Sequence, residues 1–229
     1  MLSDWGIAFE GVNVEGNPAG QAELDGLGSP GLPTVSVGAR WVNGWQPDAY
    51  ARLLGVAFDG LKMLSPDDLR RRLDRILEVT QDFVREAGDD LLAIKPPGRD
   101  RTVANLAFHV FRLSAAFVDC IEQNRFPGEW LQENAPPEMK GGRAIAEYGG
   151  KVRSRLRAWF ALAPEEIYGG SVPTFYGEQS VHAVLERTTW HAGQHTRQVH
   201  HLLNGAGYLP PEAMDHALFE GLPLPREMW

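Results

Sequence analysis

The chain has 229 residues, of which 43% are hydrophobic and 23% charged, a balance typical of a soluble globular protein with one or two domains. Its formal net charge of −8 argues against nucleic acid as a main partner, because phosphate binding requires a basic face. The single cysteine excludes an intramolecular disulfide and any Cys-x-x-Cys redox or zinc motif.

Targeting signals are not evident in the sequence. No basic region followed by an apolar run lies at the N-terminus, as a signal peptide would require. No apolar run approaches the roughly 20 residues that cross a bilayer. We therefore expect a cytoplasmic protein without a membrane partner.

Residues 1–57 form the first predicted domain, which differs from the rest of the chain in its many glycines and short strand-like runs. We predict a strand at residues 7–14, a helix at 17–28, two strands within 33–42 and a second helix at 46–54. This order, with Leu32-Pro33 before a strand, resembles the C-terminal part of a thioredoxin or glutaredoxin fold. The resemblance implies a cis peptide bond before Pro33.

The cysteine motif of that fold is missing here, so the resemblance implies an incomplete βαββα segment without dithiol chemistry. We interpret the segment as a structural appendage or a dimer contact. A remnant docking surface for a thiol cofactor is the alternative. Because an incomplete sheet leaves open strand edges, we expect a homodimer.

Residues 58–229 form the second predicted domain, a four-helix bundle with a C-terminal tail, so the fold class is mainly α. Serine at the cap, proline at the first helical position and two acids in the first turn mark a helix start at Ser65. Helical spacing of apolar residues and proline- or glycine-rich loops define the other elements. The helices are predicted at residues 65–88, 101–123, 144–163 and 178–205, with loops at 89–100, 125–142 and 164–177 and a tail at 208–229 that wraps the bundle.

The last of these helices carries two histidines that are four residues apart. His191 and His195 therefore share one face, together with apolar residues that point to the core. A pair at this spacing can hold one metal ion from one side. Two hydrogen-bonded core histidines are the alternative interpretation.

A third histidine, His109, lies within the apolar stripe of the second bundle helix, between Leu106 and Leu113. If the two helices are neighbours, three ring nitrogens converge at about 2.0–2.2 Å from one ion. We expect metal binding at such a site to weaken below about pH 6, where imidazole nitrogens become protonated. His200 and His201 fall away from this face and are predicted to be peripheral.

The chain resembles the DinB-like metal-binding four-helix bundles over roughly residues 65–229. The residues that carry this resemblance are His109 and the His191-x-x-x-His195 pair with Gln198 after it. The resemblance implies that the three histidines are metal ligands. The usual His-Arg-Gly-Gln run of that family here has Thr196 and Arg197 before the glutamine, a departure that concerns the groups around the ligands. Characterised relatives include metal-dependent enzymes that use a low-molecular-weight thiol, as S-transferases or isomerases.

Three functions follow from such a site. Three neutral imidazoles leave a divalent ion, Zn²⁺, Ni²⁺, Fe²⁺ or Mn²⁺, with open positions for a thiol, water or a small-molecule substrate. The preferred hypothesis is a metal-dependent thiol S-transferase that acts on a small electrophile. A metal-binding protein without turnover and a metal-dependent hydrolase are the alternatives. No Glu or Asp is assigned as a general base, so the catalytic residues are left open.

Four other residues near these helices are considered for the site. Gln198 is a candidate for the surroundings of the metal or for a surface position. Arg112 and Arg187 flank the histidine faces, where they bind a substrate carboxylate or, as we prefer, form surface salt bridges. Cys120 lies roughly 16 Å along the helix from His109, too far to ligate the same ion, and is predicted to be a buried apolar residue.

Overall fold

The computed structural model describes residues 2, 5–14, 16–44, 46–58, 63–96, 101–208, 214–224 and 228. These form two compact units, one of Met1–Lys62 with Phe175–Glu178, the other of Met63–Thr174 with Gln179–Trp229. The predicted domain boundary at residues 57 and 58 lies next to residues 59–62, which fall outside the described part. The last four residues of the predicted 89–100 loop also fall outside it.

The N-terminal unit contains two helices and one hairpin, in the order α1 (Pro18–Leu27), β1 (Thr34–Val37), β2 (Arg40–Asn43) and α2 (Pro47–Leu54). The two strands pair antiparallel, with Thr34 opposite Asn43. The Leu32-Pro33 peptide bond is cis, as predicted.

The predicted strand at residues 7–14 is wrong, because this segment has no regular secondary structure. A strand needs a neighbour for its backbone N–H and C=O groups. Within the described residues β1 pairs only with β2, so no second ladder is available to this segment. The observed order is therefore αββα instead of βαββα, and the likeness to a thioredoxin fold stays a prediction.

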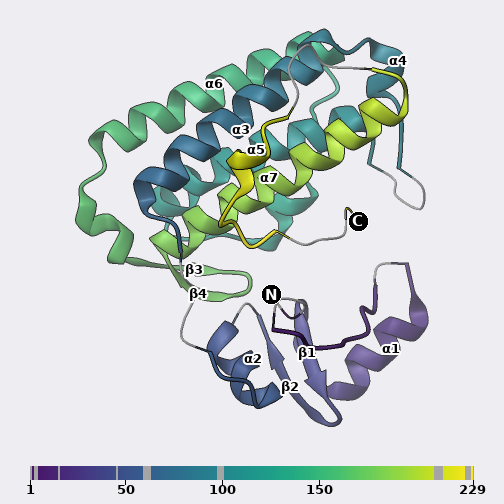
Figure 1. The fold of residues 1–229 in the computed structure, drawn as a ribbon, viewed down its shortest axis with the longest axis vertical. Helices are drawn as coiled ribbons and strands as arrows, with labels where there is room; N and C mark the ends of the chain where they lie inside the picture. The colour runs from purple at the N-terminus through teal and green to yellow at the C-terminus, as the bar shows by residue number, and fades with distance from the viewer. Residues whose placement is uncertain are drawn as a thin grey trace. The chain divides into compact units, whose positions relative to one another are not determined.

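The second unit is built on four long helices, α3 (Pro66–Glu86), α5 (Val103–Gln123), α6 (Gly141–Leu162) and α7 (Val181–Gly205). α3 and α5 each contact both α6 and α7, so that α3 and α5 lie on one diagonal of the bundle and α6 and α7 on the other. Figure 1 shows the four helices side by side. The prediction of a mainly α four-helix bundle is confirmed.

Local sequence signals explain where these helices begin and end. The Ser65 hydroxyl accepts a hydrogen bond from the Asp68 backbone N–H at 3.1 Å, and Pro66 takes the first helical position. Thr102 and Ser180 cap α5 and α7 in the same way. Asn124 ends α5 in the left-handed conformation, with a φ of 51°.

α5 is the most apolar helix of the bundle. Its 21 residues are long and apolar enough to cross a membrane by length and composition, so the expectation that no run approaches this length is wrong. However, 72% of the relevant window is buried inside the protein. α5 is the core helix of the bundle, since its side chains pack against α6 and α7 instead of lipid.

Three predicted loops contain additional structure. The short helix α4 (Asp89–Leu92) lies in the first, the 3₁₀ turn η1 (Gly128–Gln132) in the second, and the turn η2 (Glu165–Gly169) with strand β3 (Ser171–Thr174) in the third. β3 pairs with β4 (Gly177–Ser180), so the last helix begins at Val181 and not at residue 178. The hairpin holds the backbone extended up to Ser180, whose side chain then caps α7.

The C-terminal tail packs on the bundle through the 3₁₀ turn η3 (His216–Phe219). Arg72 of α3 donates from Nη1 to the carbonyls of Ala217, Leu218 and Glu220 at 2.9, 3.1 and 2.6 Å. Phe219 of this segment is buried. In Figure 1 this segment, drawn in yellow, runs across the helices.

Candidate metal centre

The structure brings together the three histidines that the sequence predicts as ligands. α5 carries His109 and the neighbouring α7 carries His191 and His195. One ring nitrogen from each histidine lies within 4.8 Å of the others. The Nε2 atoms of His191 and His195 are 3.1 Å apart, and the His109 ring centroid is 5.1 Å from each of the other two.

The donor set fits a divalent cation. Nitrogens bound at about 2.1 Å to one ion are themselves about 3.0–3.4 Å apart, and the His191–His195 separation falls in that range. The Nδ1 atom of His109 is buried and has no hydrogen-bond partner in the described part of the protein. A buried nitrogen without a partner carries a desolvation cost that coordination or another polar contact offsets.

The electrostatics keep two of these rings neutral. Burial, followed by the charges of His195, Arg101 and Arg187, lowers the pKa of His109 to about 2. Burial and the same cationic neighbours also hold the pKa of His191 well below its ordinary value. Both rings therefore present lone pairs throughout the neutral range. Burial therefore lowers the pH at which protons compete with a metal for these two rings, and the expected weakening of metal binding below about pH 6 stays a prediction.

Low folded-state pKa values also make the metal-free protein sensitive to acid. In the unfolded chain the histidine pKa is near 6.5, so below that pH the unfolded chain binds protons that His109 and His191 do not bind in the folded protein. Their contribution to the free energy of unfolding is therefore present above about pH 6.5 and is lost below it. Each contributes a slope of about 1.4 kcal/mol per pH unit between pH 6 and 5.

Glu186 opposes this trend, because burial raises its pKa to about 7 in the folded protein. As the pH falls towards the lower pKa that glutamate has in the unfolded chain, Glu186 therefore stabilises the folded state. We therefore isolate the histidine term by comparing urea unfolding of the wild type and His109→Ala between pH 7.5 and 5. Below about pH 6 the variant should lose less stability on acidification than the wild type, by about 1.4 kcal/mol per unit. Parallel pH profiles would contradict the assignment.

Three polar residues of α7 that follow His191 make side-chain contacts around the histidine cluster. His195 Nδ1 is 2.6 Å from Gln198 Oε1, so Gln198 contacts a candidate ligand directly. Thr196 is buried, and its hydroxyl lies 2.6 Å from that of Thr80 on α3. Arg197 donates to Gln194 Oε1 at 3.0 Å. Thr196 therefore ties α7 to α3, while Gln198 contacts His195 within α7.

The two predicted arginines lie in different surroundings. Arg112 pairs with Glu133 and, at 3.0 Å, with Asp119, so it forms salt bridges, but its side chain is only 13% exposed and these are not the surface salt bridges that we preferred. Arg187 precedes His191 by one helical turn, and its Cζ is 6.0 Å from each of the Phe126 and Trp190 rings.

Sequence reasoning missed Arg101 and Glu186. Arg101 donates to the Leu131 carbonyl at 3.1 Å, and its charge lowers the pKa of both His109 and His191. It lies one residue before the Thr102 cap of α5, outside the helical periodicity from which the other residues were predicted. Glu186 is a buried acid in an apolar stretch of α7. An acidic residue within an apolar stretch is the sequence pattern from which Glu186 could have been predicted. It lies roughly 140° around the helix from His191, so it does not face the same side.

Cys120 is buried, as predicted, and burial raises its pKa to about 12. Its thiol donates to the Phe117 carbonyl at 3.1 Å. The protein therefore offers no thiolate of its own, because this is its one cysteine.

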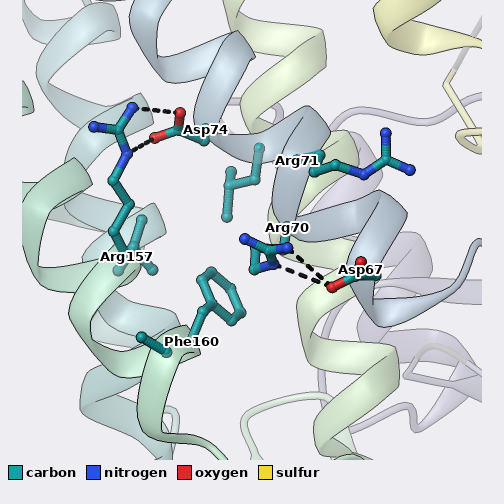
Figure 2. A pocket seen from close by; sticks show the side chains of 9 residues that line it. Asp67, Arg70, Arg71, Asp74, Arg157 and Phe160 are labelled. Carbon is teal, nitrogen blue, oxygen red and sulfur yellow. Dashed lines mark hydrogen bonds and ion pairs between the residues drawn. The ribbon is translucent and has the colours of Figure 1, made fainter.

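A separate cavity of about 400 Å³ lies between α3 and α6. Figure 2 shows Arg157 paired with Asp74 and Arg70 paired with Asp67, with Phe160 at the wall. The third arginine, Arg71, pairs with Asp68. These guanidinium groups are neutralised by adjacent carboxylates, so the cavity lacks the charge excess of an anion site.

The fold and the histidine cluster together define a helical bundle whose core geometry is compatible with metal binding. The bundle is similar to that of the DinB-like protein YjoA from Bacillus subtilis, with 14% identity and a TM-score of 0.52 over 65% of this chain and 96% of that one. A DinB-like protein from Bacillus cereus ATCC 10987 has 20% identity and a TM-score of 0.50 over 61% and 91%. At these identities the likeness shows the fold alone, and the chain has a DinB-like fold. No family model and no curated protein matches the sequence.

Proposed function

We propose that the protein binds one divalent metal ion through His109, His191 and His195 and joins a low-molecular-weight thiol to a small electrophilic substrate. The observation that carries this proposal is the convergence of three imidazoles, two of them buried and held neutral, on one point of the bundle core. A divalent ion held there lowers the pKa of a coordinated thiol or water and polarises a carbonyl group.

An enzyme is favoured over a structural metal site by the number of ligands. Structural zinc sites use four protein ligands, whereas catalytic sites keep a position open. The cluster in the described residues contains three histidines and no fourth Cys, Asp or Glu. Zn²⁺, Ni²⁺, Fe²⁺ and Mn²⁺ all accept three imidazoles, with affinity favouring the later metals.

A thiol is favoured over water as the nucleophile by the charges nearby. Arg101 and Arg187 act on the buried histidines, and this positive surrounding stabilises a thiolate. No carboxylate belongs to the histidine cluster in the described residues, so no member of the cluster is assigned as a base for water activation. The thiol has to come from solution, because Cys120 is buried and protonated.

The test loads metal-free protein with each of the four metals and measures conjugation of cysteine or glutathione to 1-chloro-2,4-dinitrobenzene. We expect a metal-dependent acceleration of at least about 100-fold. Cys120→Ala should retain it, since that thiol is not used. Metal-dependent ester hydrolysis without conjugation would support the hydrolase, and metal binding without either activity would support a non-catalytic role.

We also propose that the protein is a homodimer that associates through its N-terminal unit. One groove of about 590 Å³ in that unit is lined by four apolar side chains that are 41–57% exposed, those of Phe9, Val12, Leu32 and Val37. Sedimentation equilibrium at micromolar concentration should give twice the chain mass, and Leu32→Asp should shift the protein to monomer. A monomeric wild type would contradict the proposal.

A further inference from the structure

The C-terminal end of the chain is hydrogen-bonded to the helix that carries two of the three histidines. The Met228 backbone carbonyl accepts from Gln198 Nε2 at 2.6 Å and from Gln194 Nε2 at 2.9 Å. Gln198 Oε1 in turn lies 2.6 Å from His195 Nδ1. These contacts form a continuous chain from the penultimate residue to a candidate metal ligand.

Each contact in this chain has one permitted direction. A carbonyl oxygen only accepts, so Gln198 must present its NH₂ group to Met228. Its amide oxygen then faces His195, and because that oxygen also only accepts, His195 Nδ1 must carry the proton. In a neutral imidazole the proton on Nδ1 leaves the lone pair on Nε2. Nε2 is the atom that lies 3.1 Å from Nε2 of His191.

The second glutamine is oriented independently. Arg197 is a donor without acceptor capacity, and its Nη1 lies 3.0 Å from Gln194 Oε1. Gln194 therefore also turns its NH₂ group towards Met228. The carbonyl has two lone pairs and accepts both amides, so the tail is held at a position where it orients Gln198.

We infer that the Met228 carbonyl is a positioning group that, through Gln198, selects the Nδ1-protonated tautomer of His195 and directs its Nε2 lone pair to the metal site. Without this carbonyl, Gln198 is able to turn its amide by half a turn and donate to Nδ1. The proton then moves to Nε2 and blocks coordination. The inference rests on the proposed metal centre for its consequence, but the tautomer itself is a property of the metal-free protein.

The test compares two truncations. A variant lacking residue 229 ends at the Met228 carboxylate, which still accepts from both glutamines. A variant lacking residues 228 and 229 has no acceptor at this position. ¹⁵N NMR of the histidine rings in metal-free protein should show Nδ1-protonated His195 in the wild type and in the first variant, and a tautomer mixture in the second.

Metal affinity, measured by chelator competition, should follow the tautomer. We expect Gln198→Ala to weaken binding by about 10- to 100-fold, the usual effect of losing a group that orients a ligand. The two-residue truncation should weaken it less, and adding Gln198→Glu to that truncation should restore both readouts, because a carboxylate accepts from Nδ1 in either orientation. Gln194→Ala is the matched control, since it contacts Met228 but not His195, and it should retain the tautomer.

An unchanged His195 tautomer in both Gln198→Ala and the two-residue truncation would overturn the inference. Thermal unfolding of each metal-free variant shows whether it is folded, so that lost binding is not confused with lost structure. If no variant binds metal, the proposed function fails while the NMR result still decides the inference. If all bind equally, the metal centre stands and the inference fails.

Discussion

His109→Ala should abolish stoichiometric metal binding while the bundle stays folded. One of three ligands is lost, and we expect affinity to fall by at least about 100-fold, beyond the usual effect of losing an orienting group. The metal-free protein should lose little stability, because the side chain has a buried nitrogen without a partner in the described residues and most of the bundle core is formed by apolar side chains. Elemental analysis and chelator competition measure the binding.

His201→Ala is the matched control for this experiment. His201 lies on α7 as well, but it is exposed and does not belong to the histidine cluster. This variant should keep one metal ion per chain. Full occupancy in His109→Ala, or equal loss in both variants, would show that the three histidines do not share an ion.

Gly142→Ala should cause the largest loss of stability, because α6 packs against α3 without room for a side chain. A Cβ at residue 142 would lie 1.8 Å from the Val84 carbonyl oxygen and 2.8 Å from Leu92 Cδ1. The first of these atoms is backbone of α3, so relief requires the two helices to separate. We expect a loss of about 3 kcal/mol or more in the free energy of unfolding, measured in urea.

Gly150→Ala on the same helix provides the contrast. There a Cβ would meet Gln81 Nε2 at 3.1 Å, a side-chain atom that donates to the Ala146 carbonyl at 2.9 Å, so relief requires a side chain to shift by a few tenths of an ångström and not two helices to separate. Alanine is favoured over glycine in a helix by about 1 kcal/mol, which offsets this contact. Equal effects of the two substitutions would mean that α3 and α6 are not in close contact at Gly142.

The helices of the bundle could be predicted from the sequence because the signals that define them are local. The Ser65 cap, the apolar stripe around His109 and the spacing of His191 and His195 all depend on residues within a few turns. The same locality explains the errors. Residues 7–14 look like a strand with bounding glycines but have no strand partner in the described part of the chain. α7 begins at Val181 because the residues before it form strand β4.

The sequence by itself determined the bundle, the start of α3 at the Ser65 cap and the three histidines that face its core, because helical periodicity and capping act over a single element. Tertiary structure alone decided that α5 and α7 are neighbours, so that the histidines converge, and that Arg101 acts on them. It also decided that the carbonyl of Met228 reaches Gln198. These contacts join segments far apart in the chain, and they depend on how helices and tail pack, for which no single stretch of sequence carries a signal.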